Sequence, residues 1–375
     1  MYRCNRGAIN GFTTRKYGFI ILLKWYGNIS FNNLIKKEEK MQLPEEILNK
    51  VIEISYDINK KEIAQNFRKI SDKYMGDKKG DVLLAEEQEA IAYSIARMPA
   101  TYGAVRTAIN HVLEMFVDES FETIIDVGAG TGAATLALMQ ELEEHEISVS
   151  SAKCLEREEA MISVGKTLFS ESSSESVKNA SWIKFDINDM SSMLENETMK
   201  ADIVITSYML NEFAEEKIFG VIDKLWSMTN KMLLIVDPGT PKDHKRMIKI
   251  KNYLYEKGGN IVAPCTCNSG CHLPETDWCH FTCRVERTKI QKQVKNANVP
   301  YEDEKFTYLA VLKDKSIKPI NGVNRIIRHP VIRSNMIEVK LCSNGEIMNR
   351  IYTKKDKETY KMLKKAKVGD LVEIR

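Results

Sequence analysis

The sequence predicts an α/β protein with a doubly wound, mostly parallel sheet, an N-terminal helical subdomain and a cysteine-rich insertion. Three observations support this fold class. Residues 121–257 alternate short apolar runs with helical stretches, which is typical of strand–helix units in a sheet covered on both faces. Residues 43–116 place apolar side chains at helical spacing. Residues 265–283 then break the alternation with five of the chain's eight cysteines.

The helical subdomain is expected over residues 41–120. A Pro-Glu start at 44–45 introduces an amphipathic pattern, and Pro99 and Gly103 predict a turn between two later helices. Residues 1–40 lack such a pattern, and KKEEK precedes Met41. We therefore expect residues 1–40 to be a non-native extension, with the true start at Met41.

The core is expected over residues 121–262 as five strands, each followed by a helix or a loop. Apolar runs bounded by turn residues predict the strands, and longer amphipathic stretches predict the helices. The expected strands are 122–127, 147–156, 181–187, 201–209 and 231–239, and the main helices are 131–144, 157–169, 214–228 and 241–257.

The cysteine-rich insertion is expected at 263–300, and residues 301–375 should supply the last core strands and a basic end. EKFTYLAVLK at 304–313 predicts a sixth strand. The stretch 335–354 predicts two strands around an Asn-Gly turn. A basic helix should follow at 356–370, ended by Gly369.

A glycine loop ends the first predicted strand. Asp126 begins D-V-G-A-G-T-G, whose three glycines let the backbone pass close to a ligand at a helix start. Acidic residues also end the next two strands, where ligands bind in doubly wound sheets. The loop glycines are Gly128, Gly130 and Gly132, and the acidic residues are Glu156 and Asp186.

This arrangement resembles a class I S-adenosylmethionine-dependent methyltransferase over residues 121–257. The resemblance implies that Asp126 and the loop hold the methionine end of the cofactor. It also implies Glu156 at the ribose and Asp186 on the adenine side. A nucleotide-type fold that keeps the loop only for packing is the alternative.

The segment after the fourth strand, where the resemblance would place the methyl acceptor, gives no catalytic residue. The sequence after the fourth strand is S-Y-M-L-N-E-F at 207–213, which matches neither D/N-P-P-Y/F nor a Pro-Cys nucleophile context. Tyr208 could stack on a base and Asn211 could bond to one, but Tyr208 and Phe213 could equally be packing residues. Whether the protein is an enzyme stays open on these residues.

The cysteine spacing favours an iron–sulfur centre over zinc. Cys265, Cys271 and Cys279 are spaced C-x5-C-x7-C, whereas structural zinc sites use tight C-x2–4-C pairs. Iron–sulfur clusters accept irregular spacing and often a distant thiolate, for which Cys342 is the candidate. The alternative is that these residues are free buried cysteines that bind no metal.

Four sequence elements together resemble a specific family. They are A-R-M-P-A-T-Y at 96–102, the glycine loop, V-D-P-G-T-P at 236–241, and D-W-C-H-F with R-V-E-R at 277–287. The chain is similar to the methyltransferase-like proteins of the small ribosomal subunit from Met41 onward. The resemblance implies a [4Fe-4S] cluster on Cys265, Cys271, Cys279 and Cys342, although Cys267 and Cys283 depart from the family pattern. It also implies contact with small-subunit rRNA and with ribosome assembly intermediates.

The charge distribution fits a polyanionic partner. Residues 284–375 hold 22 Lys/Arg against 11 Asp/Glu, whereas the whole chain has a net charge of only +3. Arginines expected to meet rRNA phosphates include Arg284, Arg287, Arg325, Arg328 and Arg333. A solvated basic surface is the alternative. Arg97 and Tyr102 are candidates for covering the cofactor site or stacking on RNA, with helix packing as the other role for Tyr102.

These observations leave two leading hypotheses. One is an rRNA methyltransferase, and the other is an assembly factor that binds rRNA and transfers nothing; a small-molecule methyltransferase is disfavoured by the basic end. The sequence predicts a cytoplasmic, reducing location, since it shows no secretory signal and disulfides do not persist there. It shows no membrane-spanning run, and nothing in it demands more than a monomer.

Overall fold

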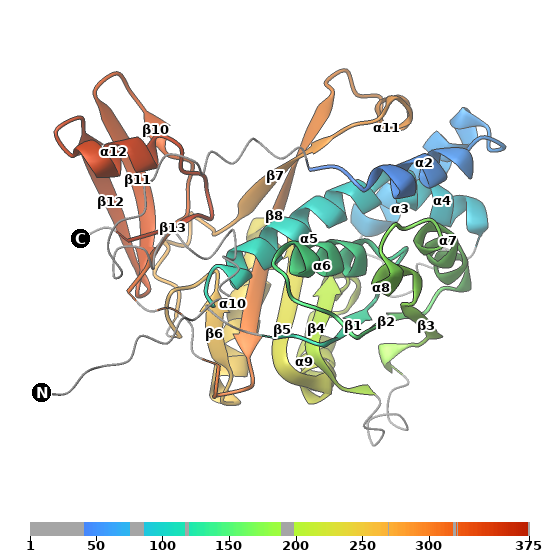
Figure 1. The fold of residues 1–375 in the computed structure, drawn as a ribbon, viewed down its shortest axis with the longest axis horizontal. Helices are drawn as coiled ribbons and strands as arrows, with labels where there is room; N and C mark the ends of the chain where they lie inside the picture. The colour runs from blue at the N-terminus through green and yellow to red at the C-terminus, as the bar shows by residue number, and fades with distance from the viewer. Residues whose placement is uncertain are drawn as a thin grey trace, which may run out of the picture.

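The computed structural model describes residues 41–75, 86–116, 120–188, 199–268, 270–317, 320 and 322–373. The expectation for residues 1–40 lies outside these residues. Figure 1 shows one large sheet flanked by helices, with a smaller sheet at the C-terminal end. No helix in the described ranges combines the length and apolar character needed to cross a membrane.

The N-terminal subdomain is helical, as predicted. Its helices are α2 (Glu45–Glu53), α3 (Lys60–Met75), α4 (Glu87–Ala96) and α5 (Met98–Leu113). The predicted turn at Pro99 and Gly103 is wrong, because both residues lie inside α5. Pro99 sits in the first turn, where a missing N–H costs nothing, and the break between helices is at Arg97. Gly103 instead permits close packing, since a Cβ there would lie 2.8 Å from Val285 Cγ2.

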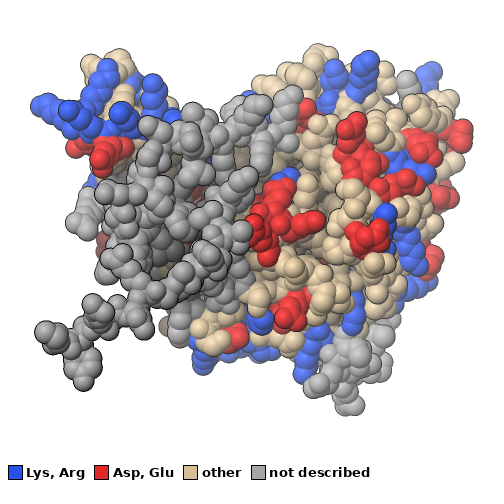
Figure 2. All heavy atoms as spheres, in the orientation of Figure 1, with Lys and Arg blue, Asp and Glu red and all other residues tan. Residues whose placement is uncertain are grey.

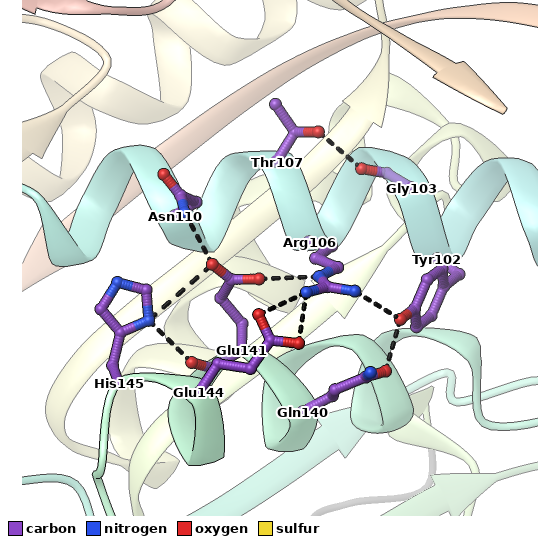
Figure 3. Close-up of polar contacts among 9 residues, drawn as sticks. All are labelled: Tyr102, Gly103, Arg106, Thr107, Asn110, Gln140, Glu141, Glu144 and His145. Atoms are coloured by element: carbon purple, nitrogen blue, oxygen red, sulfur yellow. Dashed lines mark hydrogen bonds and ion pairs between the residues drawn. The ribbon is translucent and has the colours of Figure 1, made fainter. Parts of the chain in front are cut away.

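A buried polar network joins α5 to α6 (Ala133–Glu144), as Figure 3 shows. Arg106 on α5 donates from Nε to Glu141, at 2.8 Å, and from Nη2 to Glu144. Asn110 also donates to Glu141, and Tyr102 donates to Gln140. Tyr102 is fully buried, so its role is helix packing rather than stacking on RNA.

The main sheet has the order β3-β2-β1-β4-β5-β8-β6. Only β8 is reversed among these seven strands, and it runs antiparallel between β5 and β6. This order is that of a class I methyltransferase fold, which confirms the predicted fold class. The strands are β1 (Thr123–Val127), β2 (Ser151–Glu156), β3 (Ser181–Lys184), β4 (Ala201–Ser207), β5 (Thr229–Pro238), β6 (Asn260–Ala263) and β8 (Tyr301–Leu312).

Both faces of the sheet are covered, which explains the continuous apolar runs of its strands. Neighbouring residues of β1 point to opposite faces. Ile124 belongs to an apolar cluster that includes residues of α4, α5 and α6, whereas Ile125 belongs to a second cluster that includes residues of α9 (Ile218–Met228) and α10 (Pro241–Glu256). This part of the chain also contains α7 (Glu159–Phe169), α8 (Glu175–Lys178) and 3-10 turns at Leu210–Glu212 and Glu215–Lys217. Thr240 begins α10 by accepting a hydrogen bond from the Asp243 N–H.

The cysteine-rich segment connects two strands, β6 and β7 (Phe281–Glu286), that both pair with β8. β6 pairs with the C-terminal half of β8, and β7 pairs with its N-terminal half. Residues 264–280 therefore run from Ala263, opposite Ala310, back to Phe281, opposite Phe306. The segment 263–300 also contains a helix, α11 (Lys289–Val294), that opens with a capping box at Thr288.

A second, five-stranded sheet follows β8. It consists of β9 (Asn324–Ile326), β10 (Val331–Ile332), β11 (Met336–Ser343), β12 (Glu346–Thr353) and β13 (Leu371–Val372), with α12 (Lys357–Leu363) packed on it. The predicted Asn-Gly hairpin is present, with positive φ at Asn344 and Gly345. The basic helix is shorter than predicted and ends well before Gly369.

Candidate functional site

A cavity opens at the carboxyl ends of the parallel strands. The space between its walls is about 740 Å³, which includes space open to solvent. Its walls come from α4, the glycine loop, the ends of β2 and β4, and the chain after β3. The residues that line it include Tyr93, Gly128, Gly130, Glu156, Arg157, Met161, Phe185, Asp186, Tyr208, Met209 and Phe213.

The glycine loop has a backbone conformation that side chains would strain. Gly130 has a φ of +56°, and a Cβ there would lie 3.6 Å from the Tyr93 ring. Gly132 has a φ of +89°, and a Cβ there would lie 2.6 Å from the Phe169 ring. Glycine at these two positions therefore keeps the loop tight against α7 and leaves the cavity side open.

Glu156 is held against this loop. Its carboxylate accepts hydrogen bonds from the backbone N–H of Gly130 at 2.7 Å, Arg157 at 2.8 Å and Glu158 at 2.9 Å. Burial raises its pKa, and these three bonds act in the opposite direction. Since a carboxylate has about four acceptor positions, Glu156 keeps room for roughly one further donor, such as a sugar hydroxyl.

Asp126 lies beneath the loop rather than on the cavity wall. Its Oδ2 accepts from the N–H and hydroxyl of Thr135, at 3.1 and 2.8 Å, which anchors the start of α6. Its Oδ1 is buried without a partner among the described residues. Burial raises the pKa of Asp126 to about 7. Asp186 does line the cavity and accepts from the N–H and side chain of Asn188.

A polar cluster borders the cavity beyond β4. Tyr208, with a φ of +56°, donates its hydroxyl to Glu304 at 2.9 Å. Arg97 pairs with the same Glu304 oxygen at 3.2 Å and lies 5.4 Å from the Tyr208 ring centre. Arg97 does not line the cavity itself and reaches it only through its contacts with Tyr208 and Glu304. Glu304 was missed, because nothing distinguishes it from its neighbours in the acidic start of β8.

The candidate metal ligands gather around a second cavity. Cys265, Cys271, Cys279 and Cys342 all line it, although Cys342 comes from β11 of the second sheet. Cys267 lines it as well. Cys283 does not, since its sulfur packs 3.2 Å from the position of a Cβ on Gly103.

The described residues contain no group of three or more His, Cys, Asp or Glu side chains placed to hold a metal ion. Three of the thiols that line this cavity are protonated more readily than exposed thiols. Burial raises the pKa of Cys265 to about 11 and raises those of Cys279 and Cys342. His244 also lines the cavity, and its Nε2 is buried without a described partner.

Partly buried ion pairs and one buried arginine tie the second sheet to this region. Asp277 of the cysteine segment pairs with Arg328 and, at 2.7 Å, with Lys340 of β11. Arg325 is fully buried and donates to the carbonyls of Pro264 and Gly369. Its assignment to rRNA phosphates is therefore wrong, since the burial that lets it join these segments removes it from the surface.

The other arginines in that set are paired but closer to solvent. Arg284 pairs with Asp303, Arg287 with Glu302 and Arg333 with Glu338. Figure 2 instead shows Lys and Arg side chains gathered at the end that carries α12. Residues 350–367 there hold eight Lys/Arg against two Asp/Glu.

Comparison with known proteins identifies the family. The model for "Mitochondrial small ribosomal subunit Rsm22" matches residues 87–373, which span the cofactor cavity, the thiol cavity and the second sheet. The chain belongs to the Rsm22 family. It is also 22% identical over 304 residues to the human protein named "Ribosome assembly protein METTL17, mitochondrial". That match covers 76% of this chain and 62% of the human protein, so the chain spans less than two thirds of its relative.

Solved methyltransferase structures are similar at a lower level. Magnesium protoporphyrin IX methyltransferase from Synechocystis, solved with bound SAM, shares 13% identity at a TM-score of 0.37, covering 69% of this chain and 99% of that one. A putative RNA methyltransferase from Pyrococcus horikoshii shares 16% identity at a TM-score of 0.37, covering 68% and 99%. The fold assignment of this Rsm22-family protein rests on its strand order, not on these matches.

Proposed function

We propose that this protein assists assembly of the small ribosomal subunit by binding its rRNA, and that it carries S-adenosylmethionine and a [4Fe-4S] cluster. The observation that supports the cofactor most directly is Glu156, which accepts a hydrogen bond from the Gly130 N–H and lines the cavity at the strand ends. The family and the relative named as a ribosome assembly protein support the assembly role.

The cofactor cavity offers a partner for each part of S-adenosylmethionine. Glu156 would accept from the ribose, and Asp186 and Phe185 would border the adenine. Gly128 and Gly130 would let the backbone approach the methionine end, with Asp126 holding the loop from below. Bound there, the cofactor would supply an electrophilic methyl group. Arg97 and Glu304 fix Tyr208 on the side from which an acceptor would approach.

That fixed tyrosine favours the second candidate function, an assembly factor that transfers no methyl group. Tyr208 lines the cavity, and its hydroxyl and ring are both engaged by neighbours. An acceptor base would have to displace these neighbours. The two candidates therefore differ in whether the cofactor reacts or only stabilises the fold.

The cluster would be held by Cys265, Cys271, Cys279 and Cys342, with Cys267 as an additional thiol in the same cavity. Thiolates from the segment 264–280 and from β11 would then tie the main sheet to the second sheet. Its role would be structural, because the thiol cavity and the cofactor cavity share none of the residues that line them.

The cofactor proposal is tested by calorimetric titration with S-adenosylmethionine. Gly130→Asp should abolish binding, because it strains a positive φ and brings a second carboxylate beside Glu156. Gly220→Asp is the matched control, since a Cβ there meets nothing within 4 Å. Equal affinity in all three proteins would contradict the assignment of the cavity.

Methyl transfer is tested by mapping rRNA modifications in a deletion strain. One methyl group that is lost on deletion and restored by wild-type protein, but not by Gly130→Asp, would establish catalysis. An unchanged map with accumulated immature small subunits would establish the assembly factor. Normal subunits and an unchanged map would contradict both.

The cluster is tested by metal analysis of anaerobically purified protein. About four iron and four sulfide per chain are expected for a cube-type cluster. Stoichiometric zinc without iron would overturn the proposal. A Cys267→Ser variant that retains full iron, beside a Cys271→Ser variant that loses it, would support the assigned ligand set.

A further inference from the structure

An excess of basic side chains without acidic partners surrounds α12. Residues 350–367 hold eight Lys/Arg against two Asp/Glu, and one of the two acids, Asp356, already accepts from the Thr353 N–H at 2.9 Å. All eight basic residues are exposed, and none of their side chains forms an ion pair within the part of the chain that the structure describes. We call these residues the α12 surface: Arg350, Lys354, Lys355, Lys357, Lys361, Lys364, Lys365 and Lys367.

This lack of partners sets the α12 surface apart from other arginines of the C-terminal third. Arg284, Arg287 and Arg333 each pair with a nearby carboxylate, so much of their charge is neutralised within the protein. The charge of the α12 surface is not offset in this way. It is therefore available to a negatively charged partner.

The helix arranges part of this charge in a row. Lys357, Lys361 and Lys364 follow one another at spacings of four and three residues, which places them on one side of α12. The side that carries Leu363 is packed instead, because Leu363 is fully buried in the apolar cluster of the second sheet. Figure 1 shows α12 at the end of the molecule away from the parallel sheet. The helix thus offers lysines rather than an apolar face, which suits a polyanion better than a membrane.

The α12 surface lacks the aromatic platforms with which proteins hold unpaired bases. Proteins bind single-stranded RNA by stacking its bases on aromatic side chains, in addition to contacts with phosphates. Residues 314–375 contain two Phe, Trp or Tyr side chains, Tyr352 and Tyr360, and both pack against the apolar cluster of the second sheet. Double-helical RNA is instead recognised mostly by its shape and through its phosphates and 2′-hydroxyls.

We propose that the α12 surface docks on the phosphates of a double-helical segment of RNA rather than on unpaired bases. The inference rests on the proposed function, since it specifies the form of rRNA that the protein would bind. Lysines make up seven of the eight charges. Lysine binds phosphate as a point charge and is depleted at protein–protein interfaces, which favours RNA over an acidic protein as the partner.

The experiment measures binding of the full chain to two fluorescent RNAs at about 0.15 M salt. One RNA is a hairpin with a stem of about 16 base pairs, the span of common double-stranded RNA-binding modules. The other is an unpaired strand of the same length that contains only adenine and cytosine. The hairpin should bind at least about tenfold more tightly, and changing Lys357, Lys361 and Lys364 together to Gln should remove most of that difference.

The control changes Lys166, Lys242 and Lys245 together to Gln. It removes the same charge from exposed positions on the main domain and should leave the preference for the hairpin intact. Equal affinity of wild type for the two RNAs, or a preference that survives the loss of the three α12 lysines, would overturn the inference. So would displacement of the hairpin by poly-L-glutamate at the same concentration of charge, since an acidic protein would then fit equally well.

Hydrogen exchange of the wild-type complex gives a second readout that needs no variant. The bound hairpin should slow exchange at α12 and in the turn before it, whereas protection confined to the main domain would overturn the inference. Wild-type protein that binds neither RNA would instead contradict the proposed binding of rRNA. The failure of this inference and the failure of the proposed function are therefore distinguishable.

Discussion

At the scale of single residues, the raised pKa of Asp126 predicts how the stability of the protein depends on pH. Its pKa is about 7 in the folded protein against 3.8 for the free side chain, because it is buried. A raised carboxyl pKa means that the folded state binds the proton more tightly than the unfolded state. Its contribution to stability is therefore full below about pH 4 and is lost as pH rises through about 7.

Asp126→Asn removes this titration while keeping an oxygen for Thr135. The free energy of unfolding of wild type should fall relative to the variant between about pH 4 and 7, by at most about 4 kcal/mol. Urea unfolding at a series of pH values measures the difference. Asp202→Asn, at the opposite end of the strands, is the control. Parallel curves for wild type and Asp126→Asn would contradict the prediction.

Individual residues also show which parts of the candidate site could be predicted from the sequence. Gly128, Gly130, Glu156 and Asp186 were grouped from their positions at strand ends, which meet at one edge of a parallel sheet, and all four line one cavity. Gly132 is not among the residues that line it. Arg325 was misassigned because sequence gives charge but not burial. Glu304 gave no signal, since its role depends on β8 lying beside Arg97 and Tyr208.

At the scale of elements, the packing of α5 on α6 depends on one arginine. Arg106 bridges Glu141 and Glu144, and both Arg106 and Glu141 are buried (Figure 3). Arg106→Met should destabilise the protein by about 3–5 kcal/mol, because it leaves the buried carboxylate of Glu141 without its cation. Thermal or urea unfolding measures the loss.

A thermodynamic cycle that changes the two glutamates together as one unit separates this charge effect from the change in packing. Adding Glu141→Gln and Glu144→Leu to Arg106→Met should recover much of the stability, since no buried charge is left unpaired. Lys50→Met, at a partly exposed pair with Glu53, should change stability by less than about 1 kcal/mol. Additive losses in the cycle would show that the network is not coupled.

Elements were predicted best where packing left a local signal. The strands of the parallel sheet were found because both of their faces are buried, which produces apolar runs. Strands β6 and β7 were missed, since they are short and their pairing depends on β8, which follows them in the chain. Pro99 was taken for a break because a proline in a helix's first turn resembles one that ends a helix.

At the scale of the whole molecule, the proposed cluster predicts how firmly the two sheets are held together. Cys271→Ser should increase hydrogen exchange and proteolysis at β9–β13 while the parallel sheet stays protected, since metal binding contributes folding free energy. Cys154→Ser, in the main core, offers a contrast, because any destabilisation there should affect the parallel sheet itself. Unchanged exchange in Cys271→Ser protein that has lost its iron would argue against the structural role.

The basic surface around α12 leads to a prediction about the affinity of the protein for rRNA. The eight Lys/Arg of residues 350–367 extend from β12 across α12, and Lys354, Lys355, Lys361 and Lys364 are exposed there. Replacing these four by Gln should lower rRNA affinity and flatten its salt dependence. The log–log slope should fall by about 0.7–0.9 for each phosphate that a lysine no longer neutralises.

Filter binding to small-subunit rRNA at several salt concentrations measures that slope. Changing Lys166, Lys217, Lys242 and Lys245 to Gln removes the same charge from exposed positions on the main domain and should leave the slope nearly unchanged. Equal effects of the two sets would mean that net charge, rather than the α12 surface, drives binding. A retained slope in the first set would place the RNA-binding surface elsewhere, because counterion release reports only on the lysines that meet phosphate.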